Sequence, residues 1–260
     1  MLGTGGNIVG NSAGGVLFQV LGAAFLFSAA SLLFARVPRI EYAQEKLHFS
    51  ADLRSGFAFV WRIRGLRLLV LTAAVLNFFA SMAIVLILPF YQRNPGLGPV
   101  KYGIAMAVLT GGMFLGMALT SVVKIPAAKR HFWFLWCGAV SMACLVAFPF
   151  VGSFGLAIAL LALAGFANAI LNVFIMAVKQ LAVPQGMRGK VFALMGMITQ
   201  GLTPIAFALA GALAEFLPLA PLISVCFGLA ILVGLPMMFT GVFRRFIDFD
   251  PERDTIDAVR

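Results

Sequence analysis

The chain has 260 residues and a net charge of +10, and 62% of its residues are hydrophobic while only 11% are charged. Soluble domains use about 45–50% apolar residues, so this composition cannot cover a water-facing surface, and the mean hydropathy of +1.03 indicates an integral membrane protein. The positive charge does not predict nucleic-acid binding, because the basic residues lie at the ends of apolar runs rather than on one patch.

Residues 1–37 predict two membrane helices, at about 2–20 and 22–37, with a tight turn near Gly22. The apolar stretch is too long for one span of about 20 residues. A secretory signal peptide is not expected, because such a peptide begins with a positive segment and the first basic residue here is Arg36.

Residues 38–65 form the longest polar connector and contain the stretch SADLRSGFAFVWRIRG. We expect a helix on the membrane surface here, with Ser50 or Asp52 as its N-cap. Its apolar residues recur at helical spacing beside basic ones, which is typical of an interfacial amphipathic helix. The apolar set is Leu53, Phe57, Val60 and Trp61, and the basic set is Arg54, Arg62 and Arg64.

Six apolar runs of spanning length follow, and the gaps on one side of them are short. The runs are at about 66–90, 103–123, 131–151, 154–178, 191–214 and 219–243, and a polar tail follows at 244–260. Short connections make sequential helices antiparallel neighbours. The predicted fold class is therefore all-α, a polytopic transmembrane helix bundle that covers residues 66–243.

The basic residues alternate between the gaps. Seventeen of the 19 Lys and Arg residues fall in every second gap, and the other two, Arg93 and Lys101, share one intervening gap. Because short loops rich in Lys and Arg remain in the cytoplasm, we expect the connector and the C-terminal tail to be cytoplasmic. Six is an even number of spans, so the first run begins and the last run ends on the same side of the membrane, which agrees with the charges. The expected location is the cell membrane.

Neither catalysis nor metal or cofactor binding is expected. The three cysteines lie inside apolar runs without a CxxC spacing, so a disulfide or a zinc site is not expected. They are Cys137, Cys144 and Cys226. The spans and short loops also offer no carboxylate pair, no metal cluster and no nucleophile with a base, so the chain is not expected to be an enzyme.

No Asp, Glu, Lys, Arg or His lies at the centre of the six runs, and Lys179 and Glu215 lie at the ends of theirs. Since proton and ion relays use intramembrane ionisable groups, these runs offer no evident coupling site. Glu215 is either a relay group or a carboxylate at the membrane rim that faces water.

Uncharged polar residues are the candidates for a substrate path. Asn168 and Asn172 are four residues apart, so they share one face of a helix. An amide in hydrocarbon needs a partner, so such side chains either line the path or form hydrogen bonds between helices. Thr203 has a further option, because it can satisfy backbone groups freed by Pro204. The full candidate set is Asn77, Ser81, Asn168, Asn172, Gln200 and Thr203.

The glycines of one run and the basic residues of one loop can each be interpreted as structural or as functional. Gly112 and Gly116 form a GxxxG pattern with Gly111 beside it, which predicts a helix-packing seam or a hinge. Arg188 and Lys190 either anchor a cytoplasmic loop to headgroups or helix C-termini, or act in gating.

Several segments resemble the C-terminal part of Major Facilitator Superfamily transporters, in the bacterial efflux branch of macrolide and enterobactin exporter-like proteins. The segments are GNSAGGVLFQVLGAAFLFSAASLLFARVP (10–38), LRSGFAFVWRIRGLRLLVLTAAVLNFF (53–79), LPFYQR (88–93), YGIAMAVLTGGMFLGMALTS (102–121) and VPQGMRGKVFALMGMITQGLTPIAFALAGALAE (183–215).

The resemblance implies that these helices correspond to spans 5 to 12 of a twelve-span fold, so about four spans would be missing. It also implies that Asn77, on span 7, and Asn168 and Asn172, on span 10, line the central cavity. The chain departs from the family pattern at 124–132, which lacks Gly-x-x-x-Asp-Arg-x-Gly, and at Gln185 and Gly186, where an acidic residue is common.

The leading hypothesis is a secondary transporter, an antiporter that exports small amphiphilic molecules and is represented here by a truncated or C-terminal portion. The alternative is a non-transporting half-bundle: a scaffold, a dimer subunit or an inactive remnant. The expected partners are the lipid bilayer, a small amphiphilic substrate, and either an N-terminal half or a second copy.

Overall fold

The computed structural model describes residues 26–28, 30–31, 49–123 and 127–247. The chain divides into two units, Met1–Leu47 and His48–Arg260. In the first unit the described residues are helical, and the Ser31 hydroxyl donates to the carbonyl of Ser28 at 2.8 Å. The predicted helix at 2–20, most of the one at 22–37, and the tail from 248 onward lie outside the described residues.

The described part of the second unit consists of helices and their connections, without a strand. These helices are α2 (Phe49–Arg62), α3 (Arg64–Arg93), α4 (Gly98–Val122), α5 (Ala127–Ala147), η1 (Phe148–Phe150), α6 (Phe154–Ala182), η2 (Gln185–Met187), α7 (Arg188–Gln200), α8 (Thr203–Phe216), α9 (Leu219–Met238) and α10 (Gly241–Ile247). The predicted all-α class is confirmed.

Five segments among the described residues are long and apolar enough to cross a membrane. They are Arg64–Arg93, Gly98–Val122, Lys129–Phe150, Phe154–Ala182 and Gln185–Phe216, and a shorter apolar helix occupies Leu219–Gly234. Large apolar side chains such as Phe114, Leu115 and Val122 are exposed on this bundle. A surface of this kind suits lipid rather than water.

The range expected as one span at 191–214 contains a break between α7 and α8. The helical hydrogen bonds run to Gly201 N–H, which donates to Met197, and resume at Ala206 N–H, which donates to Leu202. Pro204 lies in the first turn of α8 and has no N–H to continue the ladder. Proline therefore accounts for the interruption that run length alone did not predict.

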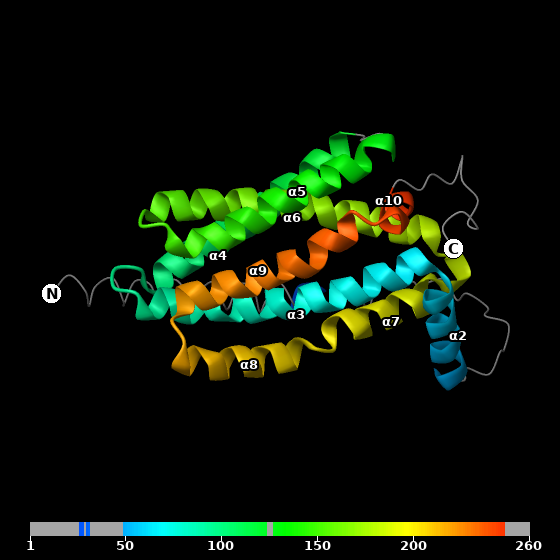
Figure 1. Cartoon of the computed structure of the whole chain (residues 1–260), viewed down its shortest axis with the longest axis horizontal. Coiled ribbons are helices and arrows are strands. Elements are labelled where there is room, and N and C mark those ends of the chain that lie inside the picture. The colour runs from blue at the N-terminus through cyan, green and yellow to red at the C-terminus, as the bar shows by residue number, and fades with distance from the viewer. Residues whose placement is uncertain (1–25, 29, 32–48, 124–126, 248–260) are drawn as a thin grey trace. The chain divides into compact units, whose positions relative to one another are not determined.

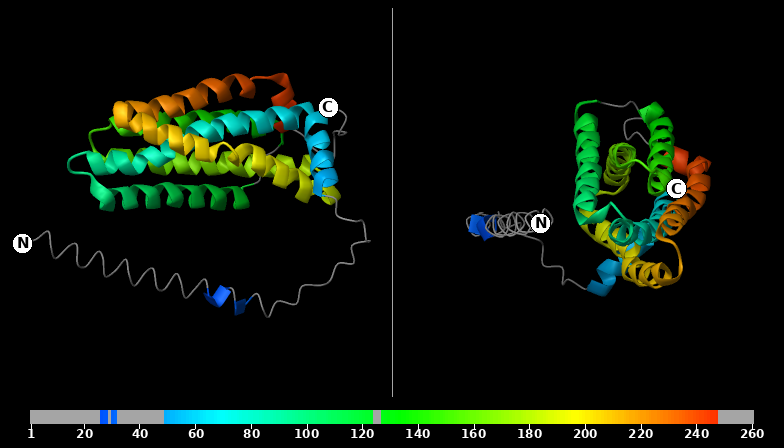
Figure 2. Two further views of the ribbon diagram at one scale, coloured as in Figure 1. Left: turned by 90° about the horizontal axis from the view of Figure 1, so that it is seen from below. Right: turned by 90° about the vertical axis from the view of Figure 1, so that its left-hand side faces the viewer.

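Helix α6 packs against both α4 and α5, while α3 packs against α9, α8 and α7. Two views of the bundle show these neighbours (Figure 2). Buried serines add hydrogen bonds between helices: Ser141 of α5 donates to Ala164 of α6 at 3.1 Å, and Ser224 of α9 donates to Val146 of α5 at 2.7 Å. Each hydroxyl thereby finds the partner that it needs away from water.

The core forms two apolar clusters, one toward each end of the bundle. The first includes Leu66, Phe174 and Val191, and the second includes Phe90, Leu161 and Phe227. Figure 1 shows α2 and α10 at one end, together with the last turn of α4, the first turn of α5 and the α6–α7 connection, and α2 runs across the bundle instead of along it.

Candidate functional site

A polar cluster lies where α3 passes the break between α7 and α8. The Asn77 amide donates to the carbonyl of Thr199 at 2.9 Å and to the side-chain oxygen of Gln200 at 2.8 Å. The Thr203 hydroxyl donates to the same Gln200 oxygen at 3.2 Å. Three of the six predicted substrate-path residues, from two parts of the sequence more than 120 residues apart, are therefore joined; we call Asn77, Gln200 and Thr203 the Asn77 cluster.

The break creates the need for this cluster. Carbonyls at an interruption in a helix lack their helical donors, and in an apolar environment they need others. The Thr199 carbonyl lies within the interrupted stretch and accepts from Asn77 of a different helix. From the sequence, Thr203 was a candidate for satisfying such backbone groups. In the structure the Thr203 hydroxyl instead bonds the Gln200 side chain, and Asn77 satisfies the backbone.

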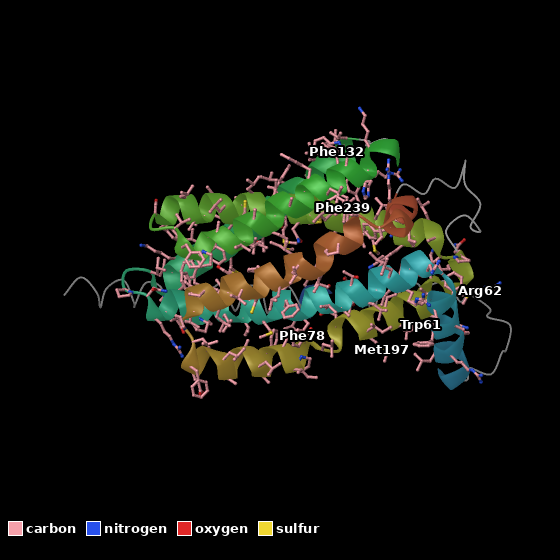
Figure 3. All side chains as sticks on the ribbon, in the orientation of Figure 1. Trp61, Arg62, Phe78, Phe132, Met197 and Phe239 are labelled. Atoms are coloured by element: carbon pink, nitrogen blue, oxygen red, sulfur yellow. The ribbon has the colours of Figure 1, made fainter. Side chains whose placement is uncertain are left out.

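The cluster is accessible from one side. Gln200 is exposed, and Asn77 and Thr203 are half-buried, as is Ser81 one turn along α3. Figure 3 labels Phe78 and Met197, which lie near the same junction on α3 and α7. Neutral amide groups thus lie beside apolar side chains that are themselves partly or fully exposed, such as Phe78 and Met197.

Asn168 and Asn172 form a second polar pair, on α6. The Asn172 amide donates to the Asn168 side-chain oxygen at 2.8 Å and to the Asn168 backbone carbonyl at 2.9 Å. Both bonds lie within one helix, and Asn172 is exposed while Asn168 is half-buried. In the described residues, no hydrogen bond joins this pair to the Asn77 cluster.

Arg188 closes the C-terminal end of α6. Its guanidinium donates to the Gln180 carbonyl at 2.8 Å and to the Val183 carbonyl at 3.1 Å. Carbonyls in the last helical turn lack intrahelical donors, and a cation also complements the negative end of the helix. This geometry supports the anchoring alternative for Arg188. Lys190 is exposed, and its backbone carbonyl lies against Gly56 of α2.

The glycines of α4 lie against α6. A Cβ added to Gly112 would overlap the Ala162 carbonyl, and one added to Gly116 would overlap the Phe166 carbonyl. Gly165 of α6 completes the seam from the other side, against the Leu109 carbonyl, and the sequence analysis missed it. Gly111 lies outside the seam, because an added Cβ there would meet nothing within 4 Å.

Charged residues at the spans' ends occupy distinct positions. Glu215 is exposed in the last turn of α8, and Lys179 is half-buried in the last turn of α6. Arg93, which had no predicted role, donates to the Ala214 carbonyl at 2.8 Å and so ties the end of α3 to the end of α8. In the sequence, Arg93 differs from most other basic residues because it lies in the intervening gap that it shares with Lys101.

Comparison with known proteins points to a family of membrane transporters. The profile of the Major Facilitator Superfamily matches residues 1–206. The chain is 29% identical over 233 residues to an uncharacterized MFS-type transporter, YfiS, of Bacillus subtilis (strain 168), a match that covers 84% of this chain and 54% of that protein. The chain thus spans about half the length of the curated relative, and no solved structure gave a significant match. Because the profile covers most of the chain, the protein belongs to the Major Facilitator Superfamily.

Proposed function

We propose that this chain forms part of a secondary transporter of the cell membrane that exports small amphiphilic molecules at the expense of an ion gradient. In this proposal its helices correspond to spans 5 to 12 of a bacterial efflux protein. The substrate path runs along the side of the bundle on which Gln200 is exposed. The C-terminus faces the cytoplasm.

The Asn77 cluster is the observation on which this proposal rests. Its amides are neutral, part-exposed and set among apolar side chains, a combination that binds a molecule with a large apolar body and a small polar group. It also lies at a broken helix, the kind of element that forms binding sites near the midplane in secondary transporters. The central turns of the described spans have no Asp, Glu, Lys, Arg or His, so in this proposal the residues that couple an ion lie outside those turns.

Dye binding to the chain in lipid nanodiscs tests the proposal. We expect a fluorescent amphiphilic cation to bind the unaltered chain, and Gln200→Ala and Asn172→Leu each to weaken this binding about three- to tenfold, since a neutral hydrogen bond contributes about 0.5–1.5 kcal/mol. Thr110→Val is the matched control, because Thr110 is an exposed polar residue whose hydroxyl bonds only its own helix, at 2.9 Å and 3.0 Å. Absence of dye binding, or equal binding by all these variants, would refute this substrate path.

A second candidate function, a half-bundle that pairs with another copy, is favoured by the outer face of α4. Gly103, Ala107 and Gly111 recur there every four residues and are exposed. Small residues at this spacing allow a second helix to approach closely in lipid. Disulfide crosslinking of an Ala107→Cys variant in membranes distinguishes the candidates: a crosslinked dimer without dye binding supports the half-bundle, and dye binding by an uncrosslinked chain supports the transporter.

A further inference from the structure

Helix α2 packs on the bundle by one face, and among the described residues an apolar stripe beside that face is partly exposed. Val60 is fully buried, and Gly56 lies against the Lys190 carbonyl of α7. The stripe consists of Leu53, Phe57 and Trp61, which are 36%, 44% and 40% exposed. The rings of Phe57 and Trp61 stack with centroids 4.6 Å apart, so the stripe is continuous.

Arginines border this stripe. Arg54 and Arg62 are exposed on α2, Arg64 is exposed at the start of α3, and the Arg67 guanidinium lies 6.0 Å from the Trp61 ring centroid. Residues 49–67 contain these four arginines and one acidic residue, Asp52. A cation-bordered aromatic stripe of this kind is complementary to negatively charged lipid headgroups and to the acyl chains below them.

Exposed tryptophans lie on α2 and in the first half of α5. The chain has three, and all of them, Trp61, Trp133 and Trp136, are exposed. Trp133 and Trp136 follow Lys129 and Arg130 in the first turns of α5, which begins at the end where α2 lies (Figures 1 and 3). Tryptophan prefers the boundary between water and hydrocarbon. Since α2 runs across the bundle, a bundle that crosses the membrane holds α2 parallel to the membrane plane.

We propose that α2 lies in the headgroup region of an anionic bilayer leaflet. Leu53, Phe57 and Trp61 enter the upper part of the acyl chains, and Arg54 and Arg62 bind lipid phosphates. Each arginine near a negatively charged membrane surface adds attraction, so the seating of α2 depends on lipid charge as well as on apolar contact. The partner of α2 in this proposal is therefore a lipid surface, and α2 lies outside the proposed substrate path.

The fluorescence of Trp61 measures how deeply α2 lies in the bilayer. The probe is the full chain with Trp133→Phe and Trp136→Phe, reconstituted in nanodiscs of phosphatidylcholine with or without phosphatidylglycerol. We expect lipids brominated near the headgroup end of their acyl chains to quench Trp61, and aqueous iodide to quench it weakly. Quenching by the brominated lipid is expected to be stronger when phosphatidylglycerol is present.

Variants that remove charge or apolar surface distinguish the effect of lipid charge from that of apolar contact. In the single-tryptophan background, Arg54→Gln with Arg62→Gln is expected to remove the extra quenching seen with phosphatidylglycerol, whereas Lys129→Gln, which removes an exposed cation of α5, leaves it unchanged. Phe57→Ser is expected to reduce brominated-lipid quenching in both lipid mixtures. Gel filtration and circular dichroism verify that each variant is folded.

Three results would overturn the proposal. Strong iodide quenching without lipid quenching would place α2 in water. Protection from both quenchers would mean that protein covers the stripe, from a second copy or another partner. Equal lipid quenching in the two mixtures, unaltered by loss of Arg54 and Arg62, would show that lipid charge has no role.

Discussion

Asn77 links two helices through one amide group, and its two acceptors differ in kind. One is the Thr199 backbone carbonyl at the helix break, and the other is the Gln200 side chain. Loss of the amide leaves the carbonyl without a donor in a poorly hydrated place, which costs more than a hydrogen bond between two replaceable side chains.

Asn77→Leu is expected to lower the free energy of unfolding by about 1–3 kcal/mol, because a part-buried carbonyl at the helix break loses its donor. Unfolding by dodecyl sulfate in mixed micelles measures the change. Gln200→Leu should cost less, and the double variant should show coupling with Asn77→Leu, since the two residues share a bond. Strict additivity of the two changes would contradict the bond.

Arg188 provides a second test at a single side chain. Arg188→Gln is expected to destabilise the chain by about 1.5–3 kcal/mol, because a charged donor leaves two carbonyls at the end of α6. Arg188→Lys should recover only part of this loss, since an ammonium lacks the planar fork that reaches both oxygens. Lys129→Gln, which removes an exposed cation of α5, serves as the control, and hydrogen exchange over 179–188 measures the local opening.

The α4–α6 seam shows how a pair of helices uses glycine in lipid. Backbones approach closely where neither helix has a Cβ, and the contacts then come from carbonyl oxygens of the facing helix. Gly112 and Gly165 contribute from opposite sides of the same contact.

Gly112→Ala is expected to destabilise the bundle by about 1–3 kcal/mol, because the added methyl overlaps the Ala162 carbonyl and the seam must open. The matched control is the adjacent Gly111→Ala, where the added Cβ meets no atom. That change should be neutral or stabilise by about 0.5–1 kcal/mol, the usual gain of alanine over glycine in a helix. Dodecyl sulfate unfolding compares them, and equal losses would contradict the seam.

Run length and helical spacing predicted much of this architecture, because both are local properties. Apolar runs of spanning length predicted where the long helices lie, and the four-residue spacing predicted that Asn168 and Asn172 meet on one face. Local patterns in the sequence could not predict contacts between distant segments. The role of Gly165, the bond from Arg93 to Ala214 and the partnership of Asn77 with Thr199 all depend on which helices become neighbours.

Described basic residues concentrate at one end of the bundle. The arginines of α2, the cations that begin α5, and those between α6 and α7 all lie there, whereas Arg93 and Lys101 lie at the α3–α4 connection at the other end (Figure 1). Lys101 is held at that connection by a bond to the Gly96 carbonyl at 2.6 Å.

A reporter fused after Arg260 is therefore expected to behave as cytoplasmic, and one inserted at Gly96 as external, because positively charged loops resist translocation. Alkaline phosphatase and green fluorescent protein fusions measure the two positions in whole cells. An active phosphatase at the C-terminus would overturn the assigned orientation.

The α4–α6 seam also has a consequence for biosynthesis. A chain is made from its N-terminus, so α4 is synthesised before the segment of α6 that contains Gly165. Among the described helices, α6 is the one that fills the groove beside Gly112 and Gly116. We therefore expect α4 to gain its main packing partner only after α6 has been inserted, so that an early helix becomes fixed after a later one has arrived.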